Sequence, residues 1–264
     1  MFSISCWGLS NMLRRTRNSL LFGWATLLSA TVGLGACILI LAEERFQSKR
    51  RVGKQLGAFL VDKRRAMIFY RVLSKVYDRL NVFFYTDTMR NDVAELAHIH
   101  QGSRVLDVGC GTGYTTEAVL KRLEIGEVDG IDMTSQQLRK AARKLNPKKV
   151  VVNLSRGDAE NLPFRNETFG AIISFGALEY FPNPERALQE MARVVKPRGR
   201  VVVGGPESEW FKRIFLDRML YTPSAKEVVE LFNQAKFRDV RCVLTGVDTF
   251  FHTDGYVVIV VGTR

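Results

Sequence analysis

Val105-Leu106-Asp107-Val108-Gly109-Cys110-Gly111-Thr112-Gly113 is the stretch that decides the fold of this chain. A short apolar run ends there in three glycines at alternate positions, and a helix-like segment follows from Tyr114 to Arg122. A strand, a glycine turn and a helix start place backbone N–H groups against a ligand with no Cβ between them. A glycine-rich turn alone is weak evidence, because similar turns also serve as ordinary corners.

Two segments further along support a ligand site at this turn. Gly130-Ile131-Asp132 ends the next apolar stretch, and Asp132 lies about 20 residues past the turn, where a ribose-binding acid is expected. A third apolar stretch, residues 150–154, leads into Gly157-Asp158-Ala159-Glu160. Glycines or acids therefore follow three successive strand-like segments, which favours a single binding edge.

The rest of the chain alternates between apolar strand-like segments and helix-like segments. Such alternation builds a parallel sheet that binds ligands at the carboxyl ends of its strands. We expect an α/β fold: a doubly wound, Rossmann-like seven-stranded sheet with an antiparallel last strand and helices between the first six strands. The expected strands lie near residues 104–108, 127–131, 150–154, 170–175, 200–204, 239–245 and 256–262.

An uncharged stretch of 24 residues, 19–42, precedes this domain. As a helix it would cross the roughly 30 Å hydrocarbon core of a membrane, so we expect an N-terminal transmembrane helix. A cleaved signal peptide fits less well, because its apolar region is usually shorter. A cleaved organelle transit peptide stays open as an alternative, since residues 1–42 contain three arginines and no acid.

The net charge of +12 is concentrated at the N-terminal end. Residues 1–81 hold 14 Lys and Arg against four acids, so the remainder is nearly neutral. A basic arm beside an apolar run favours anionic lipid over nucleic acid as a partner, and we expect no nucleic-acid binding. Five basic residues between 43 and 54 place the following domain on the cytosolic side of the membrane, or inside a mitochondrion or plastid.

The four cysteines are scattered and form no C-x-x-C pair, so neither a disulfide framework nor a metal site is expected. Cys110, within the glycine turn, is interpreted as a small residue that fills space beside the ligand. A reactive thiol at this position is the alternative.

The motifs D-V-G-C-G-T-G, G-I-D and G-D-A-E-x-L-P-F together resemble class I S-adenosylmethionine-dependent methyltransferases. The glycine spacing is G-x-G-x-G, which differs from the G-x-G-x-x-G of dinucleotide-binding proteins. The resemblance implies S-adenosyl-L-methionine as the cofactor. Together with the uncharged run and the distribution of charge, it divides the chain into a basic tail, a transmembrane helix, a basic amphipathic helical linker and a methyltransferase domain, at residues 1–18, 19–42, 43–85 and 86–264.

Four further segments resemble the methyl-phytyl-benzoquinol and methyl-solanyl-benzoquinol methyltransferases: A-M-I-F-Y-R-V-L-S-K-V-Y-D, T-D-T-M-R-N-D-V-A-E-L, G-A-L-E-Y-F-P-N-P-E-R-A-L-Q-E and the late G-P-x-x-x-W-F. These are membrane-associated enzymes that methylate the ring of a prenylated hydroquinone. The resemblance implies a membrane-anchored enzyme that methylates a lipophilic small molecule, at the ring carbon of a prenylated quinol. Alternatives are a lipid-headgroup or sterol methyltransferase, and a non-catalytic membrane scaffold that retains the fold.

Each part of the cofactor has an expected partner. The glycines let the backbone approach its methionine part, one carboxylate accepts from its ammonium group, and a second accepts from both ribose hydroxyls. A thioether packs on the adenine ring, whose edge meets a carboxylate and a backbone N–H. In chain order these cofactor-binding candidates, with the filler thiol, are Asp107, Gly109, Cys110, Gly111, Gly113, Asp132, Met133, Asp158 and Ala159. Helix capping is the alternative role for Asp132 and Asp158.

Methylation of a phenol ring is helped by a base that removes or shares the phenolic proton. The candidates are Glu179 and Tyr180, in the segment after the fourth strand, and His252, in the loop before the last strand. A structural carboxylate at a helix entry is the alternative for Glu179, and an exposed loop residue is the alternative for His252. Apolar residues at 210, 211, 214 and 215 would share one helical face, as either core or a lid over a lipid tail.

Overall fold

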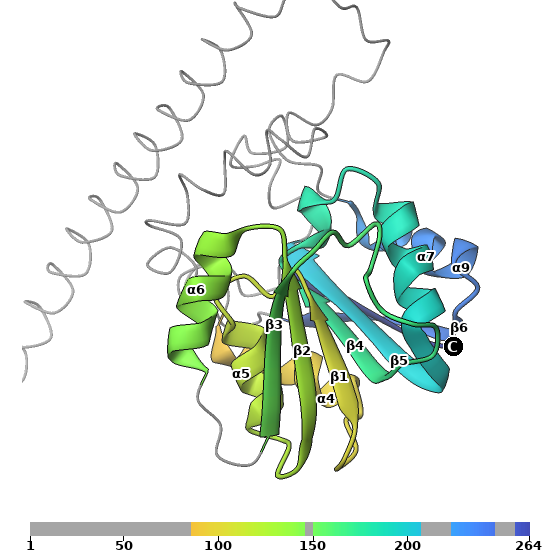
Figure 1. Cartoon of the computed structure of the whole chain (residues 1–264). Helices are drawn as coiled ribbons and strands as arrows, with labels where there is room; N and C mark the ends of the chain where they lie inside the picture. The colour runs from red at the N-terminus through yellow and green to blue at the C-terminus, as the bar shows by residue number, and fades with distance from the viewer. Residues whose placement is uncertain (1–85, 146–149, 207–222, 246–256) are drawn as a thin grey trace, which may run out of the picture. The chain divides into compact units, whose positions relative to one another are not determined.

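The computed structural model describes residues 86–145, 150–206, 223–245 and 257–264. Within these residues, seven strands form one sheet in the order β3-β2-β1-β4-β5-β7-β6 (Figure 1). The strands are β1 Arg104–Val108, β2 Gly126–Asp132, β3 Val150–Arg156, β4 Phe169–Phe175, β5 Val195–Pro206, β6 Arg238–Thr245 and β7 Val257–Thr263. All seven predicted strands are confirmed.

The last strand in the chain, β7, lies between β5 and β6 and runs antiparallel to both. The other pairs along the sheet are parallel. The predicted doubly wound sheet with an antiparallel last strand is therefore confirmed.

Helices cover both faces of the sheet (Figure 1). Residues of α4 and α5, among them Met89 and Val119, join one apolar core, and residues of α7 and α9, among them Met191 and Phe232, join the other. The described helices are α4 Asp87–Leu96, α5 Tyr114–Leu120, α6 Ser135–Lys144, the 3-10 turn η1 Leu178–Tyr180, α7 Pro184–Val194 and α9 Ala225–Gln234.

One predicted helix is wrong: residues 157–168, between β3 and β4, form a loop. Side chains of α7 bind its backbone. Arg193 donates to the carbonyl oxygens of Leu162 and Phe164 at 2.9 and 2.8 Å, and a Glu190 carboxylate oxygen accepts from the Leu162 N–H at 2.9 Å. Because these side chains satisfy the loop's polar groups, the segment needs no helical hydrogen bonds of its own.

The strand order determines where a ligand can enter. Consecutive strands leave β1 in opposite directions, toward β2 and β3 on one side and toward β4 and β5 on the other. The turn after β1 and the turn after β4 therefore lead away from each other, and they leave a crevice at the carboxyl ends of these two strands. The glycine turn that follows Val108 lies at this crevice.

Several predicted features lie outside the described residues: the span 19–42, the linker 43–85, the apolar face at 210–215, and His252. Among the helices that the structure does describe, none is long and apolar enough to cross a bilayer.

Candidate functional site

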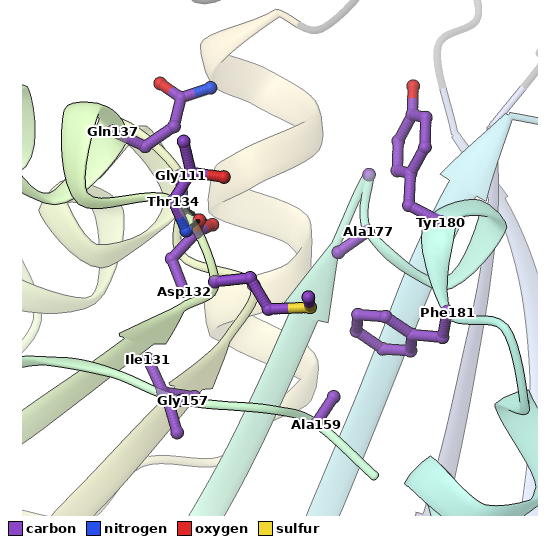
Figure 2. A pocket seen from close by; sticks show the side chains of 13 residues that line it. Gly111, Ile131, Asp132, Thr134, Gln137, Gly157, Ala159, Ala177, Tyr180 and Phe181 are labelled. Carbon is purple, nitrogen blue, oxygen red and sulfur yellow. Dashed lines mark hydrogen bonds between the residues drawn. The ribbon is translucent and has the colours of Figure 1, made fainter. Parts of the chain in front are cut away.

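A cleft opens at the carboxyl ends of β1, β2 and β4 (Figure 2). It encloses about 660 Å³ of space when its open mouth is included. Its walls come from the glycine turn, the β2–α6 connection, the turn after β3 and the turn after β4. This is the edge where the sequence predicted a ligand.

Left-handed backbone shapes the glycine turn, with φ of 75° at Gly109, 54° at Gly111 and 83° at Gly113. Gly109 and Gly111 line the cleft. A Cβ at Gly109 would lie 2.6 Å from the Cβ of Ala177, so glycine is required there by close approach as well as by φ. Gly113 does not line the cleft, and a Cβ there would press on α6, 3.0 Å from Leu145.

Asp132 ends β2, and its carboxylate is held by two backbone donors. The Gly111 N–H donates to Oδ2 at 3.0 Å and the Thr134 N–H donates to Oδ1 at 2.7 Å. Burial raises the pKa of Asp132, while these two hydrogen bonds act to lower it. Each carboxylate oxygen can accept a second hydrogen bond, so Asp132 can bridge to the start of α6 and still bind two hydroxyls in the cleft.

Asp107 does not line the cleft, and it is only 1% exposed. The Thr116 hydroxyl donates to its Oδ2 at 2.6 Å. Burial raises the pKa of Asp107 to about 7, and the nearby charge of Asp132 adds to this effect. The negative form of Asp107 therefore gains strongly from a cation placed beside it.

Cys110 is also buried, and it does not belong to the cleft lining. A Cβ at Gly130 would lie 3.0 Å from its Sγ, so the thiol occupies the space that this glycine leaves on β2. Burial raises the pKa of the Cys110 thiol well above its usual range. A protonated, buried thiol opposes a reactive one, and the role of a filler beside the ligand stays a prediction.

The predicted adenine partners divide between the cleft wall and its surroundings. Met133 and Ala159 line the cleft, whereas Asp158 does not. The Glu160 N–H donates to the Asp158 carboxylate at 3.0 Å, and Asp158 forms a single antiparallel bridge with Asn161. Asp158 therefore shapes the turn whose next residue, Ala159, faces the cleft.

The base candidates also separate. Tyr180 lines the cleft, on the wall opposite Asp132 (Figure 2). Glu179, the residue before it, is 4% exposed and does not line the cleft. Its Oε2 lies 3.2 Å from where a Cβ of Gly205 on β5 would be. His252 is outside the described residues.

Four lining residues were not singled out from the sequence: Thr134, Gln137, Ala177 and Phe181. Gln137 carried no signal, because a polar residue in a charged helix is normally a surface residue. Ala177 and Phe181 belong to the G-A-L-E-Y-F segment, in which only the two titratable residues were noted. Among the described residues, no group of three or more His, Cys, Asp or Glu side chains could hold a metal ion.

Comparisons with known proteins agree with this geometry. Residues 106–203 match the family model described as a methyltransferase domain. The chain is 40% identical, over 69% of its length, to 2-methyl-6-phytyl-1,4-hydroquinone methyltransferase 1, chloroplastic, of Oryza sativa subsp. japonica, covering 56% of that protein. It is 32% identical to the demethylmenaquinone methyltransferase of Desulfitobacterium hafniense, over 57% of this chain and 59% of that protein.

A solved S-adenosylmethionine-dependent methyltransferase from Thermotoga maritima has the same fold. It superposes with a TM-score of 0.59 at 20% identity, covering 75% of this chain and 99% of that one. The chain spans little more than half the length of the curated relatives it matches. Residues 106–203 therefore contain a methyltransferase domain, and the described residues share the fold of a solved S-adenosylmethionine-dependent methyltransferase.

Proposed function

We propose that this chain is a membrane-anchored enzyme that transfers a methyl group from S-adenosylmethionine to a ring carbon of a prenylated quinol. The observation that carries the proposal is its similarity to two groups of methyltransferases. One group is named for a phytyl hydroquinone substrate and the other for a menaquinone substrate. These substrates share a ring of the quinone type and a long apolar tail.

The described residues fit the cofactor. At Gly111, which lines the cleft, an added Cβ would have no heavy atom nearer than 4.0 Å, so the turn is open to a ligand there, and Asp132 retains acceptor capacity for a ribose. The buried Asp107 suits the ammonium group of the methionine part, because a cation removes the penalty on its charge. Met133 and Ala159 provide a weakly polar place for adenine.

The cofactor supplies a methyl carbon activated by a sulfonium. The remaining work is alignment of the ring with that carbon and exclusion of water. Ala177, Tyr180 and Phe181 form a largely apolar wall opposite Asp132, suited to the flat face of an aromatic ring (Figure 2). We assign the acceptor ring to this wall.

Tyr180 is the base candidate that the cleft geometry favours. Its side chain lines the cleft, so its phenolic oxygen can share the proton of a quinol hydroxyl and raise the electron density of the ring. Glu179 would act behind it, as a buried neighbour that keeps the turn in place. His252 remains a third candidate.

Residues 19–42 would anchor the enzyme in a membrane, where a quinol with a long tail is dissolved. The basic residues on both sides of this segment would contact anionic headgroups. The name of the rice relative states that it is chloroplastic, which favours an organelle membrane over the plasma membrane as the location.

A substrate panel tests the proposal. The full chain in detergent is incubated with S-adenosylmethionine carrying a labelled methyl group and, in separate reactions, with prenyl quinols, sterols or phospholipids. We expect label on the ring carbon of the quinols, located by mass spectrometry. Label on a sterol or a headgroup would replace the quinol assignment. Cofactor binding without transfer to any of the three classes would indicate a scaffold.

A further inference from the structure

A buried polar atom at the edge of the cleft has no hydrogen-bond partner among the described residues. Gln137, in the first turn of α6, is 2% exposed and belongs to the cleft lining. Within the part of the chain that the structure describes, its Oε1 is buried and has no hydrogen-bond partner. Burying an amide oxygen without a donor costs folding free energy, so such atoms in a cleft are candidates for ligand contact.

The surroundings of Gln137 indicate which part of a ligand it meets. Its backbone N–H donates to the Thr134 carbonyl at 3.0 Å, which places it directly after the turn that holds Asp132. Figure 2 shows Gln137, Gly111, Thr134 and Asp132 grouped along one wall, and Ala177, Tyr180 and Phe181 along the other. One wall is therefore rich in hydrogen-bonding groups, and the other is largely apolar.

A ribose has two adjacent hydroxyls, and each can both donate and accept. An ionised carboxylate only accepts, whereas an amide presents an acceptor oxygen and two N–H donors. Asp132 already uses part of its capacity on the N–H groups of Gly111 and Thr134. A neighbouring amide supplies the donor that the carboxylate lacks, and a second acceptor.

We propose that the side-chain amide of Gln137 hydrogen-bonds one of the two ribose hydroxyls of S-adenosylmethionine, which Asp132 also binds. This assignment rests on the proposed use of Asp132 for the ribose. It adds a second residue to the ribose site and makes recognition of one hydroxyl depend on α6 as well as on the strand end.

Binding of three ligands tests it in the full chain. The ligands are S-adenosylhomocysteine and its 2′-deoxy and 3′-deoxy forms, measured by calorimetry with wild type, Gln137→Met and Gln136→Met. Methionine keeps the length of glutamine and removes its hydrogen bonds. Gln136 is the neighbouring amide on the same helix, partly exposed and outside the cleft lining, so its variant is the matched control.

We expect Gln137→Met to weaken S-adenosylhomocysteine about tenfold, through loss of one buried hydrogen bond. One of the two deoxy ligands, the one lacking the hydroxyl bound by Gln137, should bind wild type and Gln137→Met equally well. Gln136→Met should bind all three ligands like wild type. The Tm of the ligand-free Gln137→Met protein should equal or exceed that of wild type, because the wild-type amide oxygen has no partner within the described part of the chain that the substitution would remove.

Other outcomes overturn the proposal. An equal loss for all three ligands places Gln137 away from the ribose, and a lower Tm with unchanged affinity makes it a structural residue. If wild type binds both deoxy ligands as tightly as the parent ligand, the ribose is not read at this wall, and the use of Asp132 fails as well. Gln137→Asn, whose amide is one methylene shorter, gives a second variant with the same expected selectivity if the methionine variant does not fold.

Discussion

The carboxyl group of Asp107 is buried, and it is also the group proposed to bind the ammonium of the cofactor. Burial raises its pKa to about 7, so at neutral pH the ligand-free domain holds it about half protonated. A ligand ammonium binds only the ionised form. Because the folded pKa lies above the ordinary value of 3.8, Asp107 favours folding at low pH and loses this contribution as the pH rises through about 7.

We therefore expect cofactor affinity to rise about eightfold between pH 6.0 and pH 7.5, as Asp107 ionises. Above about pH 8 the ligand's own amino group loses its proton and the trend reverses. Calorimetry across this range measures both effects. Asp107→Asn should bind the cofactor more weakly than wild type, and its affinity should not rise between pH 6.0 and pH 7.5.

The Thr116 hydroxyl supplies a second test of the same group. It donates to Asp107 and lowers its pKa, so Thr116→Val should move the midpoint of the affinity rise to higher pH. A wild-type affinity that is flat between pH 6.0 and pH 7.5 would separate Asp107 from the ammonium group.

Gly109 tests the close approach inside the turn. Both Gly109 and Gly102 have φ of 75°, but an added Cβ at Gly102 meets nothing within 4 Å. Gly102→Ala should cost only backbone strain, about 1–2 kcal/mol. Gly109→Ala adds a clash with Ala177 and should cost more. Urea unfolding measures both variants, and equal losses would mean that the turn after β4 can move aside. Calorimetry should show weaker cofactor binding for Gly109→Ala alone.

The sequence was most informative at residues whose type is required by the backbone. The positions of Gly109, Gly111 and Asp132 in the cleft could be predicted, because a glycine turn with positive φ and an acid at a strand end form a recognisable sequence pattern. Gln137 and Phe181 could not, since their position in the cleft results from how α6 and η1 pack. The same limit applies to Asp107 and Asp158, whose depth relative to the cleft is set by tertiary structure.

At the scale of elements, the loop between β3 and β4 depends on α7. Glu190 is 5% exposed as a side chain and pairs with Arg193 at 2.7 Å. Hydrogen bonding to Arg193 lowers the pKa of Glu190, and the loop N–H of Leu162 adds to this effect. The alternation of strands and helices predicted a helix between β3 and β4, but the contacts that replace it join residues about 30 positions apart. Such contacts leave no periodic pattern.

Removing Arg193 should therefore destabilise the domain. Arg193→Leu leaves two loop carbonyls without their donor and the buried Glu190 carboxylate without the cation at 2.7 Å, and we expect a loss of about 3 kcal/mol in the free energy of unfolding. Arg186→Leu is the control, because Arg186 is half exposed and 3.6 Å from the same carboxylate; its loss should stay below about 1 kcal/mol.

The pH dependence follows from the lowered pKa of Glu190. The pair contributes fully above the ordinary value of 4.5, and its contribution is lost as the pH falls through the lowered folded pKa. The difference in the free energy of unfolding between wild type and Arg193→Leu should therefore become smaller as the pH is lowered. Urea unfolding at several pH values measures it, and equal losses in the two arginine variants would show that the loop holds without α7.

At the scale of the whole molecule, the alternation of strands and helices was enough to predict the sheet. Even the antiparallel direction of β7 could be predicted. The connection between the last two strands is too short for the crossover that a parallel pair would need. Nothing comparable constrains residues 1–85. Their expected role rests on hydropathy and charge, so it needs its own experiment.

We expect residues 19–42 to hold the full chain in membranes. An uncharged run of this length gains from entering the hydrocarbon core, and its backbone bonds are satisfied within a helix. The full chain should stay in the pellet after alkaline carbonate extraction, whereas a chain that begins at residue 43 should be released by carbonate. That shorter chain keeps the basic linker, so any attachment it shows without carbonate should weaken with salt. Release of the full chain, or a mature N-terminus that begins after Ala42, would contradict a retained span.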